Sequence, residues 1–201
     1  MSQSEKSKMS RRFASVIDCV PEPCMVLGTP LRPFSLGHHL LFKKMGIDPF
    51  GEAFETAEFL VAVFICAHRY DDSLSSFLNG EWNAQFSRWQ KQAAKRVEEY
   101  ANARCHFLDY LIKGYAKPPV WTYPAAGGIE FSAPWEELLK CRLVNAGFSE
   151  SEIFNGYLPA IFYDYYTVLE LNQAAQLTDA KNWKRVFFTE ADAKKMGAVN
   201  G

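Results

Sequence analysis

The clearest feature of the hydrophobic pattern is an almost unbroken apolar run at 59–67, which leaves no polar face. A helix that is hydrophobic all round has to be buried, so the surrounding stretch 55–70 predicts the central helix of a globular core. The run is about half the roughly 20 residues that cross a hydrocarbon core, so we do not expect a membrane span. Thr56 is placed to cap the start of this helix, and His68 and Arg69 fall in its last turn, where the helix dipole favours positive charge.

Apolar stripes at helical spacing predict further helices on both sides of this one. Ser35 and Gly46 have the positions of an N-cap and of a C-terminal glycine around a short helix. From Trp82 to Leu111, apolar or small residues recur mostly three or four apart, which predicts a long helix that reaches about Gly114. At 1.5 Å per residue it would be about 45 to 50 Å long, so we expect part of it to kink or project. Two more helical stretches are predicted, at 135–146 and from 149 onward with a restart at 158.

Prolines divide the chain into segments. Four prolines between 16 and 34 exclude a continuous helix and predict an extended segment, in which 24–27 is either a short strand, with no clear partner strand, or ordered loop. Four prolines and a Gly-Gly pair make 115–134 the strongest break. The predicted fold is mainly α, an irregular helical bundle around the buried central helix with a Pro-rich extended N-terminal segment. The predicted parts are a flexible tail at 1–12, a helical domain at 13–114, a linker at 115–134 and a C-terminal helical region at 135–201 packed on the first domain.

Composition excludes several functions. With 22 basic and 23 acidic residues, the chain has no strong field that would steer it to nucleic acid or an anionic membrane, so neither partner is expected. The basic stretch RWQKQAAKR is followed at once by two glutamates, which is typical of a solvated helix face. Five scattered cysteines without a CxxC pair favour a reducing compartment, and the polar start lacks the apolar segment of a signal peptide. We therefore expect a cytoplasmic protein.

Aromatic residues make up 15 % of the chain. They either fill the core or form an exposed surface for a partner. The linker itself carries Trp121, Tyr123 and Phe131. Large aromatic side chains in such a connection either pack back on the domain or present a contact surface, so these three residues are the candidate partner-binding surface.

The residues that could carry chemistry do not form a motif. His38 and His39 are adjacent, so on a helix they point about 100° apart and cannot both face one ion without distortion. Cys66, His68 and Cys105 could join one of them in space, but their spacing does not predict it. The alternative is that a histidine makes a hydrogen bond at the core edge while Cys66 acts as a small buried hydrophobe. We therefore assign no catalytic, cofactor-binding or metal-binding residue and expect a protein that is not an enzyme.

Two segments carry a family resemblance. The first begins VLGTPLRPFSLGHHLLFKKMGIDPF and continues into the buried helix, and the second reads GFSESEIFNGYLPAIFYDYYTVLELN. Both resemble helical proteins encoded in the tail-gene clusters of tailed phages, particularly the tail-assembly chaperones. The resemblance implies a non-enzymatic helper in the cytoplasm of a bacterial host, which coats the tape-measure protein until the tail tube polymerises around it.

Two other functional classes stay open. A structural virion component, such as an adaptor or a tail-completion subunit, would use the same helices to hold neighbouring copies in a ring, so homo-oligomerisation belongs to this hypothesis. A small metal- or thiol-dependent enzyme is the third. Formation of a soluble complex with the tape-measure protein, presence in the mature particle, and bound metal are the observations that separate the three.

Overall fold

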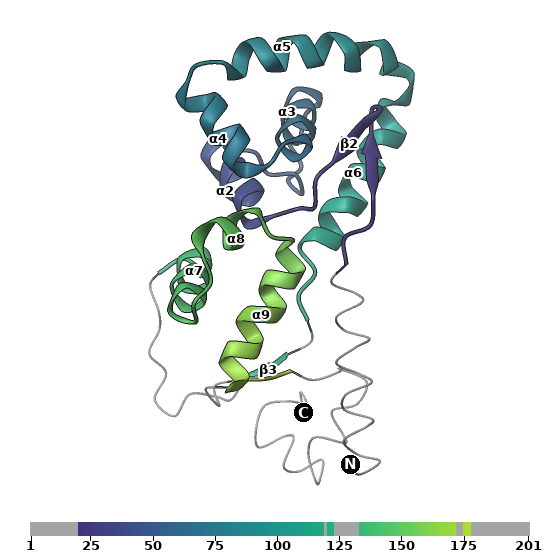
Figure 1. The fold of residues 1–201 in the computed structure, drawn as a ribbon. Coiled ribbons are helices and arrows are strands. Elements are labelled where there is room, and N and C mark those ends of the chain that lie inside the picture. Colours follow the sequence, from purple (N-terminus) through teal and green to yellow (C-terminus); the bar gives the residue numbers. More distant parts are fainter. Residues whose placement is uncertain (1–19, 119, 123–132, 172–174, 178–201) are drawn as a thin grey trace. The chain divides into compact units, whose positions relative to one another are not determined.

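The computed structural model describes residues 20–118, 120–122, 133–171 and 175–177, and the predicted tail at 1–12 lies outside them. Most described residues are in α-helices, with a few three-residue strands, which confirms the mainly α class (Figure 1). The chain divides into two compact units. The described part of the first unit comprises 20–116 and 150–159, and that of the second comprises the described residues of 117–149 and 160–177.

The first unit contains a hairpin and a set of helices. Its elements are β1 (Cys24–Val26), β2 (Thr29–Leu31), α2 (Leu36–Met45), α3 (Thr56–Ala67), α4 (Tyr70–Leu78), α5 (Trp82–Ala93), the 3₁₀-helix η1 (Ala94–Glu99), α6 (Tyr100–Gly114) and α8 (Glu150–Asn155). The second unit contains β3 (Val120–Thr122), α7 (Trp135–Asn145), nearly all of α9 (Leu158–Leu171) and β4 (Ala175–Leu177).

Helix α3 is the buried centre of the first unit, as its apolar pattern predicts. Seven of its residues are buried, and Figure 1 shows it surrounded by α2, α4, α5 and β2. Phe64 faces α5, where its ring centroid lies 4.8 Å from that of Trp82 and 5.4 Å from those of Phe86 and Trp89. Because α3 has no polar face, each side needs an apolar partner, and the aromatic residues of α5 supply one.

The ends of α3 differ from the sequence prediction. Glu55, not Thr56, is the N-cap, and its backbone N–H donates to the Glu58 carboxylate at 3.0 Å. The helix ends at Ala67, and His68 is extended, with its Nδ1 2.8 Å from the Phe64 carbonyl oxygen. The helix ends early because this side-chain contact satisfies a terminal carbonyl group.

Helix α4 occupies a stretch in which the sequence analysis places no helix. It starts at Tyr70, directly after the N-cap Arg69, and Asp71 and Asp72 lie in its first turn. The helix dipole favours acidic residues there, so the aspartates support this helix start.

The long helix predicted from Trp82 is kinked, as its length suggested. It divides into α5 and α6 at η1, where Arg96 leaves helical geometry with φ −117° and ψ 31°. Trp89 Nε1 on α5 donates to Thr29 Oγ1 at 2.9 Å, and α6 packs on β1. The two helices on either side of the kink thus contact different strands of the hairpin.

The hairpin supplies the partner strand that the sequence pattern did not show. Strands β1 and β2 are antiparallel, with Val26 opposite Thr29. The two residues between them, Leu27 and Gly28, have φ of 51° and 72°, as a type I′ turn requires. Leucine rarely adopts a positive φ, but burial of the Leu27 side chain offsets the strain.

The second unit is built from α7, α9 and a short antiparallel β3–β4 pair. Leu139 and Leu143 form the buried stripe of α7. Lys117 Nζ lies 5.7 Å from the ring centroid of Trp135 and 5.2 Å from that of Phe162, so two aromatic faces hold one cation. Among the described residues, every helix is too short or too polar to span a membrane.

Candidate functional site

An extended segment at 32–35 links the parts of the first unit that form the site. The Arg32 N–H donates to the Cys66 carbonyl at 2.8 Å, and the Tyr110 hydroxyl donates to the Arg32 carbonyl at 2.7 Å. The Leu158 N–H donates to the Phe34 carbonyl at 2.8 Å. The segment is therefore fixed to α3, α6 and the start of α9, and its backbone is a rigid wall for what surrounds it.

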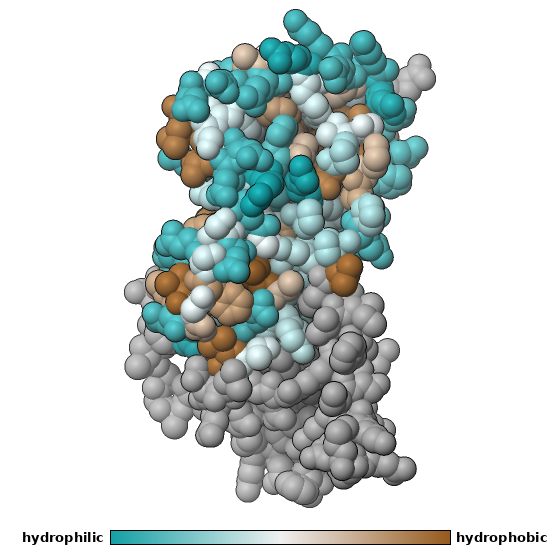
Figure 2. Space-filling view, in the orientation of Figure 1, coloured by the Kyte–Doolittle hydropathy of each residue, from teal (hydrophilic) through white to brown (hydrophobic). Residues whose placement is uncertain are grey.

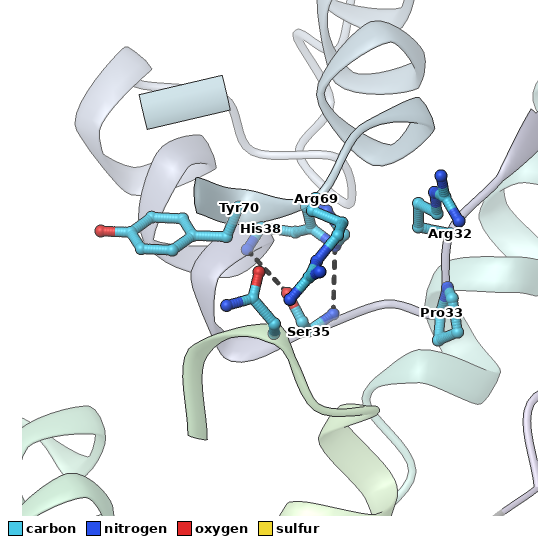
Figure 3. A pocket seen from close by; sticks show the side chains of 7 residues that line it. Arg32, Pro33, Ser35, His38, Arg69 and Tyr70 are labelled. Atoms are coloured by element: carbon cyan, nitrogen blue, oxygen red, sulfur yellow. Dashed lines mark hydrogen bonds between the residues drawn. The ribbon is translucent and has the colours of Figure 1, made fainter. Parts of the chain in front are cut away.

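His38 joins the start of α2 to the end of α3. The Nδ1 atom of its ring accepts from the Ser35 backbone N–H at 3.2 Å, and the backbone N–H of His38 donates to Ser35 Oγ at 3.3 Å (Figure 3). Its Nε2 lies 2.7 Å from the His68 carbonyl oxygen, so the neutral tautomer with the proton on Nε2 satisfies both contacts. Burial lowers the pKa of His38 to about 4, which keeps the imidazole neutral at pH 7.

A pocket of about 210 Å³ lies beside this histidine (Figure 3). It forms where the extended segment, the start of α2, the α3–α4 junction and the end of α8 meet. The residues that line it are Arg32, Pro33, Ser35, His38, Arg69, Tyr70 and Asn155.

The charge of this pocket comes from two arginines. Arg32 and Arg69 are both exposed, and neither guanidinium group has an ion pair or hydrogen bond within the part of the chain that the structure describes. Asp71 lies near, but its carboxylate accepts from Asn155 Nδ2 at 2.8 Å and from Ser151 Oγ at 3.4 Å. The lining thus carries two positive charges, and neither is neutralised by a carboxylate of the lining itself.

The structure brings together only some of the candidate residues from the sequence. His38 and His68 are adjacent in space, yet both rings contact backbone carbonyl oxygens. His39 Nδ1 lies 2.8 Å from the Tyr115 hydroxyl. Cys66 is buried, which raises the pKa of its thiol, whereas Cys105 is exposed on α6.

These residues do not form a metal site. Over the described ranges, no three His, Cys, Asp or Glu side chains are grouped so that they could hold an ion.

The candidate aromatic surface of the linker is not described by the structure. Tyr123 and Phe131 lie outside the described residues. Trp121 is described only by its backbone, which pairs with Gln176 between β3 and β4. Its assignment as a partner-binding residue stays a prediction.

A different apolar surface lies on α4. Leu74 is 36 % exposed and Leu78 is 78 % exposed, and residues four apart share one face of a helix. Between them in sequence, Phe77 stacks on Trp82 with ring centroids 4.0 Å apart and planes at 14°. Figure 2 shows hydrophobic side chains on the surface near the end of α4, below the polar face of α5. We call Leu74 and Leu78 the α4 surface.

Sequence reasoning missed the two arginines of the pocket and the α4 surface. It placed Arg69 in the last turn of one helix, whereas the structure makes it the N-cap of the next. Arg32 stands between a leucine and a proline in a segment that has no helical period, so its position carried no signal. Comparison with protein families, with curated proteins and with solved structures found no significant match to this chain.

Proposed function

We propose that this chain is a non-enzymatic helper of phage tail assembly, which binds the tape-measure protein before the tail tube polymerises. The proposal joins the resemblance of the two segments described above with one structural observation. That observation is the α4 surface, two leucines exposed on one face of a helix that is anchored in the core of the first unit.

The α4 surface has the chemistry that recognises an amphipathic helix. Ser73 and Ser76, on the other side of α4, are buried, and Phe77 is held against Trp82, so the helix is fixed where it presents Leu74 and Leu78. A partner helix can place its apolar face on such residues, as helix-binding proteins commonly do. The tape-measure protein is long and helical in this class of system, so it would offer many such faces.

The test is co-expression of the full chain with fragments of the tape-measure protein from the same tail-gene cluster. We expect a soluble complex with the unmodified chain. The double variant Leu74→Ser, Leu78→Ser should weaken it at least about tenfold, because burying a leucine contributes about 1.5 to 3 kcal/mol. The matched control is Ile112→Ser, which changes a residue 60 % exposed on α6 and should leave the affinity unchanged.

Three results would contradict the proposal. The first is that no fragment of the tape-measure protein binds. The second is that the chain is present at a fixed stoichiometry in mature particles, which favours a structural virion component. The third is one equivalent of zinc or iron in the purified protein, which favours a metal-dependent enzyme.

A further inference from the structure

The pocket beside His38 has a lining that favours one kind of ligand. A guanidinium group only donates hydrogen bonds and is always charged, and two arginines, Arg32 and Arg69, line this pocket. Of the four other described arginines, Arg96, Arg104 and Arg142 have a side-chain or backbone partner, whereas Arg88, exposed on α5, has none among the described residues. Arg96 pairs with Glu99 at 3.3 Å, and Arg104 Nη2 donates to the Phe54 carbonyl while its guanidinium lies over the Phe54 ring. At the pocket, no described residue plays these roles for Arg32 or Arg69.

Hydrogen bonds within the protein fix the residues on two sides of the pocket. The Arg32 backbone is fixed by hydrogen bonds to Cys66 and Tyr110. The opposite wall is fixed by Asn155, whose Oδ1 accepts from the Asp71 N–H at 3.5 Å and whose Nδ2 donates to the Asp71 carboxylate. A ligand therefore only has to order the two arginine side chains, which lowers the entropic cost of binding.

The two arginines approach the pocket differently. Figure 3 shows the Arg69 side chain reaching toward Ser35, whereas Arg32 stands on the other side of the pocket with its guanidinium group turned away. Both arginines are exposed, so in this arrangement Arg69 is the nearer charge and Arg32 has to change its side-chain conformation to contact a bound anion. Neutral His38 adds no charge, so the attraction comes from the arginines.

We propose that this pocket binds a small oxyanion, a phosphate or carboxylate group, with Arg69 as the main ligand and Arg32 as the second. The planar guanidinium group forms paired hydrogen bonds with phosphate and with carboxylate groups alike, so the lining suits both. A pocket of about 210 Å³ has ample room for one such group. This site is separate from the α4 surface and does not depend on the function proposed above.

The test is an NMR titration of the isotopically labelled full chain with inorganic phosphate and, separately, with acetate. Ionic strength is held constant with chloride, and the arginine Nε–H signals are followed. We expect the signals of Arg69 and Arg32 to shift and saturate with at least one of the two anions. The anion that gives saturable shifts tells whether the pocket takes a phosphate or a carboxylate group. No partner protein is present, so the result is independent of tape-measure binding.

Variants then assign the site. Arg69→Gln should raise the dissociation constant about tenfold, because one charge-assisted pair is lost. Arg69→Lys should have a smaller effect, since it keeps the charge but not the planar fork. Arg88→Gln, at an exposed position on α5, should change nothing. Shifts that never saturate with either anion, or an Arg69→Gln variant that binds like the unmodified chain, would overturn the proposal.

Discussion

His38 makes the stability of the first unit depend on pH. In the unfolded chain its imidazole has a pKa of 6.5, whereas burial lowers it to about 4 in the folded protein. Between these values the unfolded state binds the proton and the folded state does not, so the free energy of unfolding falls as the pH falls. At pH 7.5 the His38 imidazole is neutral in both the folded and the unfolded state, so its contribution to the free energy of unfolding is fully present. With these two pKa values, the loss on going from pH 7.5 to pH 5 is about 2 kcal/mol, and below pH 4 it stops growing near 3 kcal/mol.

The assay compares urea unfolding of the unmodified chain and of His38→Gln at pH 7.5 and at pH 5. The variant should be less stable at pH 7.5 by about 2 to 3 kcal/mol, because it disturbs buried hydrogen bonds to Ser35 and to the His68 carbonyl. Carboxylates titrate alike in both proteins, so the difference between them should shrink by about 2 kcal/mol at pH 5.

A matched control separates this effect from the loss of any histidine. His106→Gln changes an exposed histidine on α6 and should keep the pH dependence of the unmodified chain. An equal difference between the unmodified chain and His38→Gln at both pH values would show that folding does not lower the pKa of His38.

Two further outcomes follow from the packing of the first unit. Gly114→Ala should lower the free energy of unfolding by about 1 to 3 kcal/mol, since an added Cβ would lie 2.6 to 2.9 Å from the buried Phe34 side chain. The exposed Ile112→Ala on the same helix should cost less than about 1 kcal/mol in the same urea assay, and equal losses would argue against the steric reason. A thiol reagent should modify exposed Cys105 in the folded protein but Cys66 only after denaturation, as mass spectrometry of the digested protein would show, because burial raises the pKa of Cys66 and blocks access. Rapid labelling of Cys66 in the folded chain would contradict its buried position.

Features that depend on local pattern could be predicted from the amino-acid sequence. A run without a polar face can only be stable inside a core, so the burial of α3 follows from its composition. Ser35 and Gly46 bound α2 as predicted, because capping depends on residues within one turn of the helix end. The kink in the long helix was expected from length alone, since a straight helix would exceed a compact core.

Features that join residues far apart in the sequence depend on how the helices and the hairpin pack. The Leu27-Gly28 turn has the usual glycine at its second position but a leucine at the first, and burial of Leu27 makes that leucine acceptable. The pocket unites Arg32, Arg69 and Asn155, which are far apart in sequence and have no shared period. Hydrophobic patterning reports which face of an element is buried, but not which elements meet. For that reason the residues of the proposed oxyanion site could not be selected before the fold was known.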